Sequence, residues 1–429
     1  MFLHRRNKNH GRLLRRDCKV AVRKPVAVIV GGAPVAGGLS RSGLDRLHEV
    51  LAARVARGEL PGLVALVHRG GATHVEAIGA TAVGGSAAMR RDTVFRVASM
   101  TKPVVAVAAM VLVEEGRLRL DAPVDPFLPE LADRTVLRRV DGPLDDTVPA
   151  RRPITLRDLL TMRCGFGLVL DPPGTPIQRA LDEAGLSPGP DPFPYSADEF
   201  LRRLGELPLA SQPGEAWLYH TGFDVLGILV ERAAGQPLES FLRERVFEPI
   251  GMRDTGFHLA PEQADRLPAC YLTDTATGAP VPMADPHDWH RPPAFASGGA
   301  GLLSTADDYL AFLRMLLDGG RCAGGRVLSR RSVELMTADQ LTPEQRAGAA
   351  ALLGEGTGWG FGVAVALHRT PEGGGAGRFG WDGGRGTSGH ADPDSGLVGV
   401  LLTQLGMDSP HSPGLFADFW GAAYGAVDG

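Results

Sequence analysis

The most constraining feature of this sequence is an unbroken apolar run, Val104–Val113, that directly follows Pro103. The run carries no polar stripe, so a helix built from it is buried on every side and lies in the middle of a domain. Proline is tolerated in the first turn of a helix but not in its interior. We therefore expect a central helix that begins near Ala98 or Ser99 and ends near Gly116.

Ser99 and Lys102 stand at the head of this helix, three residues apart. Side chains at that spacing lie on one face of a helix. A helix start also collects free backbone N–H groups and the positive end of the helix dipole. A partly desolvated lysine can lose its proton near neutral pH and act as the base for a serine nucleophile. A serine at a helix start is also a common cap, so these two residues alone do not decide between catalysis and capping.

Composition indicates a globular protein without a metal, a cofactor or a membrane span. Of the 429 residues, 44% are apolar and 22% charged, which is ordinary for a soluble chain. The four cysteines are scattered and form no cluster with histidines that suggests a metal site. No apolar run reaches the roughly 20 residues that a bilayer-spanning helix needs. Outside residues 1–24 the chain is acidic, which argues against nucleic acid as the partner of the folded part.

The N-terminal segment differs from the rest of the chain because residues 1–24 hold nine Lys and Arg residues. We expect residues 1–38 to be a basic, disordered tail and residues 39–429 to form one domain. The tail resembles a signal peptide, but its apolar part is short and is broken by Pro25 and by Gly31-Gly32. We therefore favour a cytoplasmic location and keep a secreted or periplasmic one as the alternative.

Strand patterns occur near both ends of the chain, and the middle is mostly helical. The expected strands are Leu63–His68, Thr73–Ile78, Gly360–Leu367 and Leu397–Gln404, and the Pro- and Gly-rich stretch Asp171–Tyr195 is expected to be a long loop or lid. This order predicts an α/β (α+β) fold with an antiparallel sheet built from both chain ends and helices on both faces. The α/β lobe would comprise residues 39–120 and 296–429, with a mostly helical lobe inserted at residues 121–295. A cleft between lobes is the usual place for a site.

Two further stretches carry residues suited to catalysis. Tyr219 follows Pro213 and precedes a helix, so it lies on a loop or turn, where a tyrosine that shares a proton with a lysine can assist the serine. A packed loop tyrosine is the alternative. The Gly-rich stretch Phe379–Gly389 could offer a backbone N–H group to an oxyanion, together with that of Ser99, or could simply be a hairpin turn.

Three motifs follow one another along the chain: Ser99-x-x-Lys102, then Tyr219, then Trp381-x-Gly383. This order resembles that of the serine β-lactamase and penicillin-binding-protein superfamily. Within the superfamily, the chain is most similar to the class C-like, family VIII carboxylesterase branch. Further similar stretches are Ile154–Thr161, Trp217–Tyr219 with Asp224–Gly227, Phe247–Met252 with Thr255, and Gly298–Tyr309. The resemblance implies an α/β/α sandwich with a helical lobe, a covalent acyl-enzyme and no metal. It also implies that Ser99 is the nucleophile, that Lys102 and Tyr219 form the base system, and that the N–H groups of Ser99 and Gly384 form the oxyanion hole.

The chain departs from the lactam-active members at two expected substrate-binding positions. Thr221 stands where those members carry Asn, and Trp381-Asp382-Gly383 stands where they carry Lys-Thr-Gly. These changes remove an amide and a cation suited to a carboxylate, but leave ester hydrolysis intact. We therefore expect Trp381, Gly383 and Thr221 to contact the substrate.

The sequence favours a carboxylesterase that acts on a small-molecule ester or amide. A β-lactamase, a penicillin-binding-type D-amino-acid peptidase and a catalytically inactive ligand-binding relative remain as alternatives. There is no Gly-x-Ser-x-Gly elbow and no His-Glu-x-x-His motif. His220 and His390 could line the cleft, although we expect both to be structural histidines. We expect no metal at His287-Asp288-Trp289-His290. The oligomeric state stays open.

Overall fold

The computed structural model describes residues 37–170, 172–285, 287–407 and 414–427. Most of the predicted tail, residues 1–36, lies outside the described residues. The described chain is already packed at its first residues, because Arg69 Nη1 donates to the carbonyl oxygens of Gly37 and Gly38 at 3.3 and 2.7 Å. Leu39 then forms a β-bridge with Val427 near the other end of the chain.

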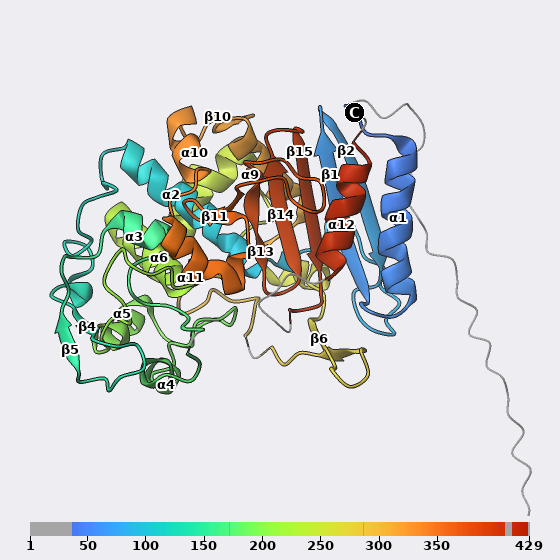
Figure 1. The fold of residues 1–429 in the computed structure, drawn as a ribbon. Coiled ribbons are helices and arrows are strands. Elements are labelled where there is room, and N and C mark those ends of the chain that lie inside the picture. The colour runs from blue at the N-terminus through green and yellow to red at the C-terminus, as the bar shows by residue number, and fades with distance from the viewer. Residues whose placement is uncertain (1–36, 171, 286, 408–413, 428–429) are drawn as a thin grey trace, which may run out of the picture.

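A seven-stranded antiparallel sheet forms the frame of the molecule, in the order β11-β12-β13-β14-β15-β1-β2 (Figure 1). Its N-terminal part is the hairpin β1 (Gly62–Arg69) and β2 (Ala72–Gly79). The C-terminal part comprises β11 (Thr357–Trp359), β12 (Ala364–Ala366), β13 (Phe379–Gly383), β14 (Thr387–Asp392) and β15 (Leu397–Thr403). The pairing of β1 with β15, in which Leu66 lies opposite Val400, joins the two ends and confirms the predicted sheet.

Helices cover both faces of this sheet because its central strands are apolar on both faces. Alternate residues of a strand point to opposite faces. Leu63 and Leu401 pack beneath α1 (Arg41–Ala56) and α12 (Gly414–Gly425), whereas Val64 and Val400 belong to the large core on the side of α9 (Ala306–Leu317).

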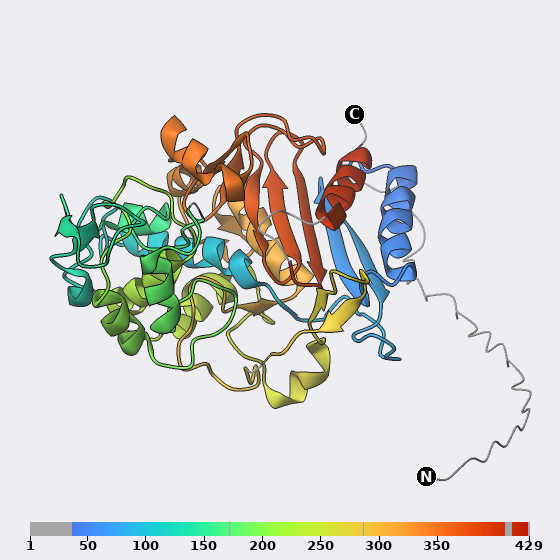
Figure 2. The same ribbon diagram turned by 60° about the horizontal axis from the view of Figure 1, so that its bottom comes forward.

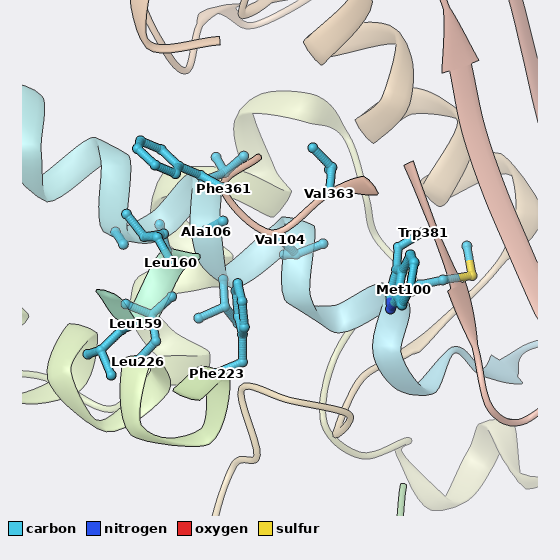
Figure 3. Close-up of a cluster of buried hydrophobic side chains, with 14 of the residues drawn as sticks. Met100, Val104, Ala106, Leu159, Leu160, Phe223, Leu226, Phe361, Val363 and Trp381 are labelled. Carbon is cyan, nitrogen blue, oxygen red and sulfur yellow. The ribbon is translucent and has the colours of Figure 1, made fainter. Parts of the chain in front are cut away.

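The predicted central helix is α2 (Thr101–Glu114), which is preceded by a 3₁₀ turn at Ala98–Met100. Twelve of its residues, from Thr101 to Leu112, are buried, as expected for a helix that is apolar all round. Figures 1 and 2 show α2 between the sheet and the helical lobe. Figure 3 shows its side chains packed among residues of the lobe and of the segment before β12, including Leu159, Leu160, Phe223, Leu226 and Phe361.

The helical lobe contains six α-helices among the described residues between α2 and β8 (Leu303–Ser304): α3 (Leu156–Leu160), α4 (Pro176–Glu183), α5 (Ala197–Gly205), α6 (Thr221–Ala234), α7 (Leu238–Leu242) and α8 (Glu248–Ile250). Small two-stranded pairs join β3 (Phe95–Arg96) to β8 (Leu303–Ser304), β4 (Thr135–Leu137) to β5 (Thr147–Pro149), and β6 (Tyr271–Thr273) to β7 (Pro280–Pro282). Two remaining helices, α10 (Arg330–Met336) and α11 (Pro343–Leu353), precede β11.

Two predicted elements are wrong in detail. The expected strand Gly360–Leu367 is broken at Gly362, where φ is +80° and an added Cβ would lie 2.8 Å from the Cβ of Ala106. The chain turns there because it passes close over α2, and only glycine tolerates that approach. The expected loop Asp171–Tyr195 contains α4, since Thr175 caps the helix and Pro176 occupies its first turn.

Within the described ranges, no helix is long and apolar enough to cross a membrane. The same residues hold no group of three or more His, Cys, Asp or Glu side chains that could bind a metal ion.

Candidate active site

A cavity of about 510 Å³ opens beside the head of α2 and brings together residues from both lobes. Ser99, Tyr219, Trp381 and Gly384 all line it. Much of the remaining wall is apolar and comes from Leu168, Leu352, Leu353, Ala364, Met407, Phe416 and Trp420. Charged or titratable side chains, among them Glu372, Arg378, Asp382 and His390, also contribute to the lining.

Ser99 lies in the 3₁₀ turn before α2 and is 7% exposed, on the cavity wall. The preceding residue, Ala98, has φ +45°, a left-handed conformation that costs a non-glycine residue roughly 1–3 kcal/mol. Such strain persists only where the surrounding structure enforces it, and it commonly marks functional sites. Here Ala98 and Val97 are held by the buried core around β3 and β13.

Lys102 is fully buried one turn further on, and its Nζ lies 3.0 Å from Ser99 Oγ. The same Nζ lies 2.8 Å from the carbonyl oxygen of Gly299 and 3.3 Å from His220 Nδ1. Burial lowers the pKa of Lys102 to about 7, although the charge of Asp224 acts in the opposite direction. A substantial fraction of this lysine is therefore a neutral amine at neutral pH.

Tyr219 lies beside the same pair. Lys102 Nζ is 4.5 Å from the centre of its ring, and Trp381 Nε1 donates a hydrogen bond of 2.7 Å to its hydroxyl oxygen. Burial raises the pKa of Tyr219, while hydrogen bonds from Ser99 and Trp381 act to lower it. The hydroxyl is therefore protonated at neutral pH and can donate a proton.

Two backbone contacts fix the Tyr219 segment to the chain that follows α3. Leu218 N donates to the carbonyl oxygen of Met162 at 2.8 Å, and Leu168 N donates to that of Tyr219 at 3.0 Å. The segment is also joined to α11, because Gln345 Nε2 donates to Gly214 O at 2.7 Å.

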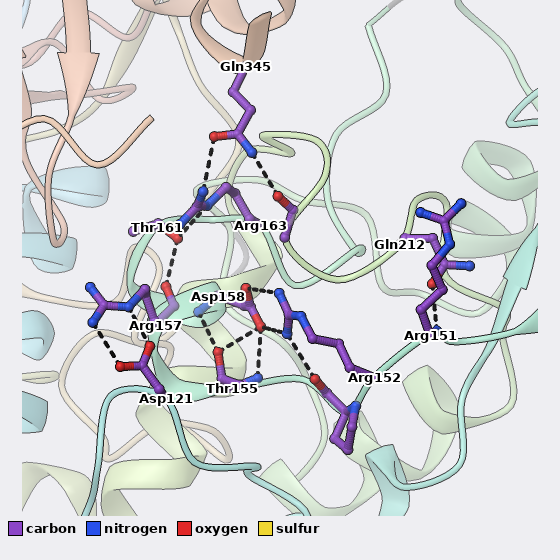
Figure 4. Close-up of polar contacts among 12 residues, drawn as sticks. Asp121, Arg151, Arg152, Thr155, Arg157, Asp158, Thr161, Arg163, Gln212 and Gln345 are labelled. Carbon is purple, nitrogen blue, oxygen red and sulfur yellow. Dashed lines mark hydrogen bonds and ion pairs between the residues drawn. The ribbon is translucent and has the colours of Figure 1, made fainter. Parts of the chain in front are cut away.

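Polar contacts around α3 hold this framework in place (Figure 4). Thr155 and Asp158 form a reciprocal capping box at the start of α3. Asp158 also accepts from both terminal nitrogens of Arg152, at 2.5 and 2.9 Å. Arg163 donates to Gln345 at 3.0 Å and so connects the end of α3 with α11.

The remaining predicted substrate-binding residues fall in two different places. Trp381 is on the cavity wall, with Gly384 just beyond the end of β13. Gly383 is not among the lining residues. An added Cβ at Gly383 would lie 2.3 Å from the carbonyl oxygen of Val97, so this glycine allows β13 to approach the turn that carries Ser99. Thr221 is 1% exposed and does not line the cavity.

Sequence reasoning missed the residues that surround the lysine. His220, expected to be structural, contacts Lys102 and lines the cavity, whereas the neighbouring Thr221 does not line it. Asp224 and Gly299 lie behind His220 and were present in the sequence only as parts of family-like stretches. His390 lines the far part of the cavity, where its Nε2 lies 3.0 Å from Asp382 Oδ1.

Comparison with known proteins decides the family. A family model described as Beta-lactamase matches residues 47–412. The chain belongs to the β-lactamase family. The matched range includes Ser99, Lys102, Tyr219 and Trp381 of this β-lactamase-family protein.

This β-lactamase-family protein is similar along most of its length to proteins of several organisms. It is 41% identical to Protein Rv1367c of Mycobacterium tuberculosis strain H37Rv, over 86% of this chain and 90% of that protein. It is 34% identical to Esterase EstB of Burkholderia gladioli, over 86% of this chain and 92% of that protein. The solved structure of "EstCE1, a hydrolase with promiscuous acyltransferase activity" matches with a TM-score of 0.75 and 28% identity, covering 90% of this chain and 99% of that chain.

Proposed function

We propose that the protein is a serine hydrolase that cleaves small carboxylic esters through an acyl-enzyme on Ser99. The observation that carries the proposal is the placement of Lys102 Nζ, which has a pKa of about 7, at 3.0 Å from Ser99 Oγ on the wall of a cavity. Two relatives named as an esterase and as a hydrolase with acyltransferase activity support esters as the substrates.

In the first half of the reaction, neutral Lys102 accepts the proton of Ser99 Oγ while that oxygen attacks the ester carbonyl carbon. The resulting oxyanion is stabilised by the backbone N–H groups of Ser99 and Gly384. As the C–O bond to the alcohol breaks, Tyr219 donates its proton to the leaving oxygen and recovers a proton from Lys102. The products of this half are the free alcohol and acylated Ser99.

In the second half, a water molecule attacks the acyl carbon. Lys102 and Tyr219 again act as the base system and take the water proton. The bond to Ser99 Oγ breaks, the proton returns to this oxygen, and the carboxylic acid leaves. An alcohol in place of the water would complete an acyl transfer by the same steps, and acyl transfer is the second activity named for EstCE1.

The cavity favours neutral esters over β-lactams and peptides that carry a carboxylate. Trp381 and Asp382 line it at the positions where lactam-active relatives carry Lys and Thr, so this part of the wall offers an indole ring and an acidic side chain. Arg378, a cation of the same lining, lies over the Trp420 ring, 4.2 Å from its centre. Leaving a substrate carboxylate poorly paired in such a site costs several kcal/mol.

We further propose a cytoplasmic location, because the apolar part of the N-terminal segment is short and interrupted.

Labelling with a fluorophosphonate tests the proposal directly. We expect wild-type protein to gain the mass of one phosphonyl group, located on Ser99 by peptide mapping. Ser99→Ala should not react and should lose p-nitrophenyl butyrate hydrolysis by roughly a thousandfold or more. Ser86→Ala, which changes an exposed serine, is the matched control and should behave as wild type. A Ser99→Ala protein that keeps most of its rate would exclude the mechanism, and an unreactive wild type would favour the inactive ligand-binding alternative.

A further inference from the structure

His220 occupies an unusual place directly behind the candidate base. It is 3% exposed and has φ +85°, a conformation in which non-glycine residues are uncommon. It immediately precedes α6, and its backbone N–H points to Met162 Sδ at 3.3 Å. In this conformation its Nδ1 lies 3.3 Å from Lys102 Nζ.

Asp224 lies one turn further along α6 and faces the other side of the imidazole. Its Oδ2 is 3.3 Å from His220 Nε2, a close electrostatic contact that lies outside hydrogen-bond geometry. Its Oδ1 accepts from Ser297 Oγ at 2.6 Å and from Gly299 N at 3.1 Å. The carboxylate is 1% exposed, so it is fixed in position by these contacts.

Gly299 closes the arrangement from the segment before β8. Its carbonyl oxygen accepts from Lys102 Nζ, while its N–H donates to Asp224. An added Cβ would lie 2.7 Å from His220 Nε2 and 2.9 Å from Asp224 Oδ1. The close packing of these groups therefore requires glycine at this position.

The chemistry of the neighbours determines where the protons lie. A neutral amine has two N–H groups and one lone pair. Gly299 O is only an acceptor, and His220 Nδ1 accepts when Nε2 carries the ring proton toward the Asp224 carboxylate. With both N–H groups of Lys102 used in this way, the lone pair is left facing Ser99 Oγ, the third neighbour of Nζ at 3.0 Å.

We propose that Asp224 and His220 act as a positioning pair that directs the Lys102 lone pair at the Ser99 hydroxyl and sets the pH at which Lys102 becomes a base. The inference rests on the proposed hydrolase function and extends it to two residues that act through Lys102, of which His220 lines the cavity and Asp224 does not. The negative charge of Asp224 beside Nε2 favours the tautomer of His220 that carries its proton on Nε2, and His220 Nδ1 then holds the rotation of the amine.

The charge of Asp224 has a second consequence for Lys102. The described groups that face the lysine are Ser99 from the 3₁₀ turn, Tyr219 and His220 before α6, Asp224 of α6 and the Gly299 carbonyl. Of these groups, only Asp224 is ionised at neutral pH. Burial and the charge of Lys102 lower the pKa of His220, so its ring is neutral. A carboxylate stabilises the protonated amine, so its removal must lower the pKa of Lys102 further.

The pH dependence of kcat/KM for p-nitrophenyl butyrate tests the role of Asp224. Activity requires neutral Lys102, so the wild-type acid limb should have its midpoint near pH 7. In Asp224→Asn the midpoint should move to lower pH by about one unit, even if the maximal rate falls. Asp158→Asn, which changes a buried carboxylate that pairs with Arg152, is the control and should leave the midpoint in place.

Two substitutions of His220 test the hydrogen bond separately. Asn at this position keeps a side-chain oxygen acceptor, whereas Leu removes it, so His220→Asn should retain most of kcat and His220→Leu should lose roughly 10- to 100-fold in kcat with little change in KM. His68→Asn, which changes a buried histidine of β1 bonded to Thr73, should match wild type.

The positioning pair is overturned if the acid limb of folded Asp224→Asn stays at the wild-type midpoint, or if His220→Asn and His220→Leu lose kcat equally. Should Asp224→Asn fail to fold, as judged by its thermal midpoint, the comparison of the two His220 variants still decides. Failure of the proposed function would be seen differently, as an absence of phosphonate labelling on Ser99 in the wild-type protein.

Discussion

The hydrogen bond between Trp381 and Tyr219 allows a test that separates the catalytic role of the indole N–H from the packing role of the ring. Trp381→Phe removes the indole N–H that lies 2.7 Å from the Tyr219 hydroxyl oxygen but keeps an aromatic ring on the cavity wall. The ring packs edge-on against Trp359, with centroids 4.9 Å apart, and phenylalanine can retain much of that contact.

The expected loss follows from the value of one hydrogen bond. A neutral hydrogen bond contributes about 0.5–1.5 kcal/mol net, and each 1.36 kcal/mol corresponds to a tenfold change in rate. The bond stabilises the Tyr219 oxygen most when that oxygen gives up its proton, so the loss should fall on kcat. We therefore expect kcat on p-nitrophenyl butyrate to drop by about 2- to 13-fold, with KM changed less than twofold.

Trp359→Phe is the matched control for this experiment. Trp359 is fully buried, does not line the cavity, and donates its Nε1 proton to Leu160 O at 3.3 Å. Its replacement should lower the thermal midpoint and leave kcat near the wild-type value. The reasoning is refuted if Trp381→Phe keeps the wild-type kcat, or if both tryptophan variants lose kcat to the same extent.

Three further predictions concern coupling, specificity and the N-terminal segment. Lys102→Ala combined with Tyr219→Phe should cost little more in kcat than the worse single variant, because residues that act as a unit are non-additive; additive losses in log rate would make Tyr219 a packing residue. Specificity for p-nitrophenyl butyrate should exceed that for nitrocefin by about 100-fold after correction for intrinsic reactivity, and Trp381→Lys should reduce this ratio by supplying a cation. A chain that begins at Gly37 should keep the wild-type rate and thermal midpoint, whereas a drop in either would show that the removed residues dock on the domain.

The fold could be predicted from the sequence because its elements carry strong local patterns. The run Val104–Val113 has no polar stripe, and in the structure it belongs to a buried helix between the two lobes. The apolar strands at both chain ends pair as β1 and β15. The strand break at Gly362 was missed because it depends on how closely a distant helix, α2, passes beneath the glycine.

The candidate site was predictable where its residues are close in sequence or belong to a family-like motif, as Tyr219 and Trp381 do. The spacing of Ser99 and Lys102 along one helix face requires them to be neighbours. His220 was assigned a structural role, and Thr221 was expected in the cavity, because the left-handed conformation of His220 cannot be read from residue types. That conformation, together with Gly299 from a segment about 80 residues later, decides which side chain reaches the lysine.

The pairing of β1 with β15 has a consequence for how the chain is made. Leu66 lies opposite Val400, so roughly 330 residues must be synthesised before the first strand meets its partner. At 5–20 residues per second, ribosomes need on the order of 20–60 s for that length. During this time the apolar edge of β1 is exposed, and an unpaired edge is a template for association with other chains. Heterologous production of this protein should therefore benefit from slower initiation, which reduces the number of nascent chains that wait at the same moment.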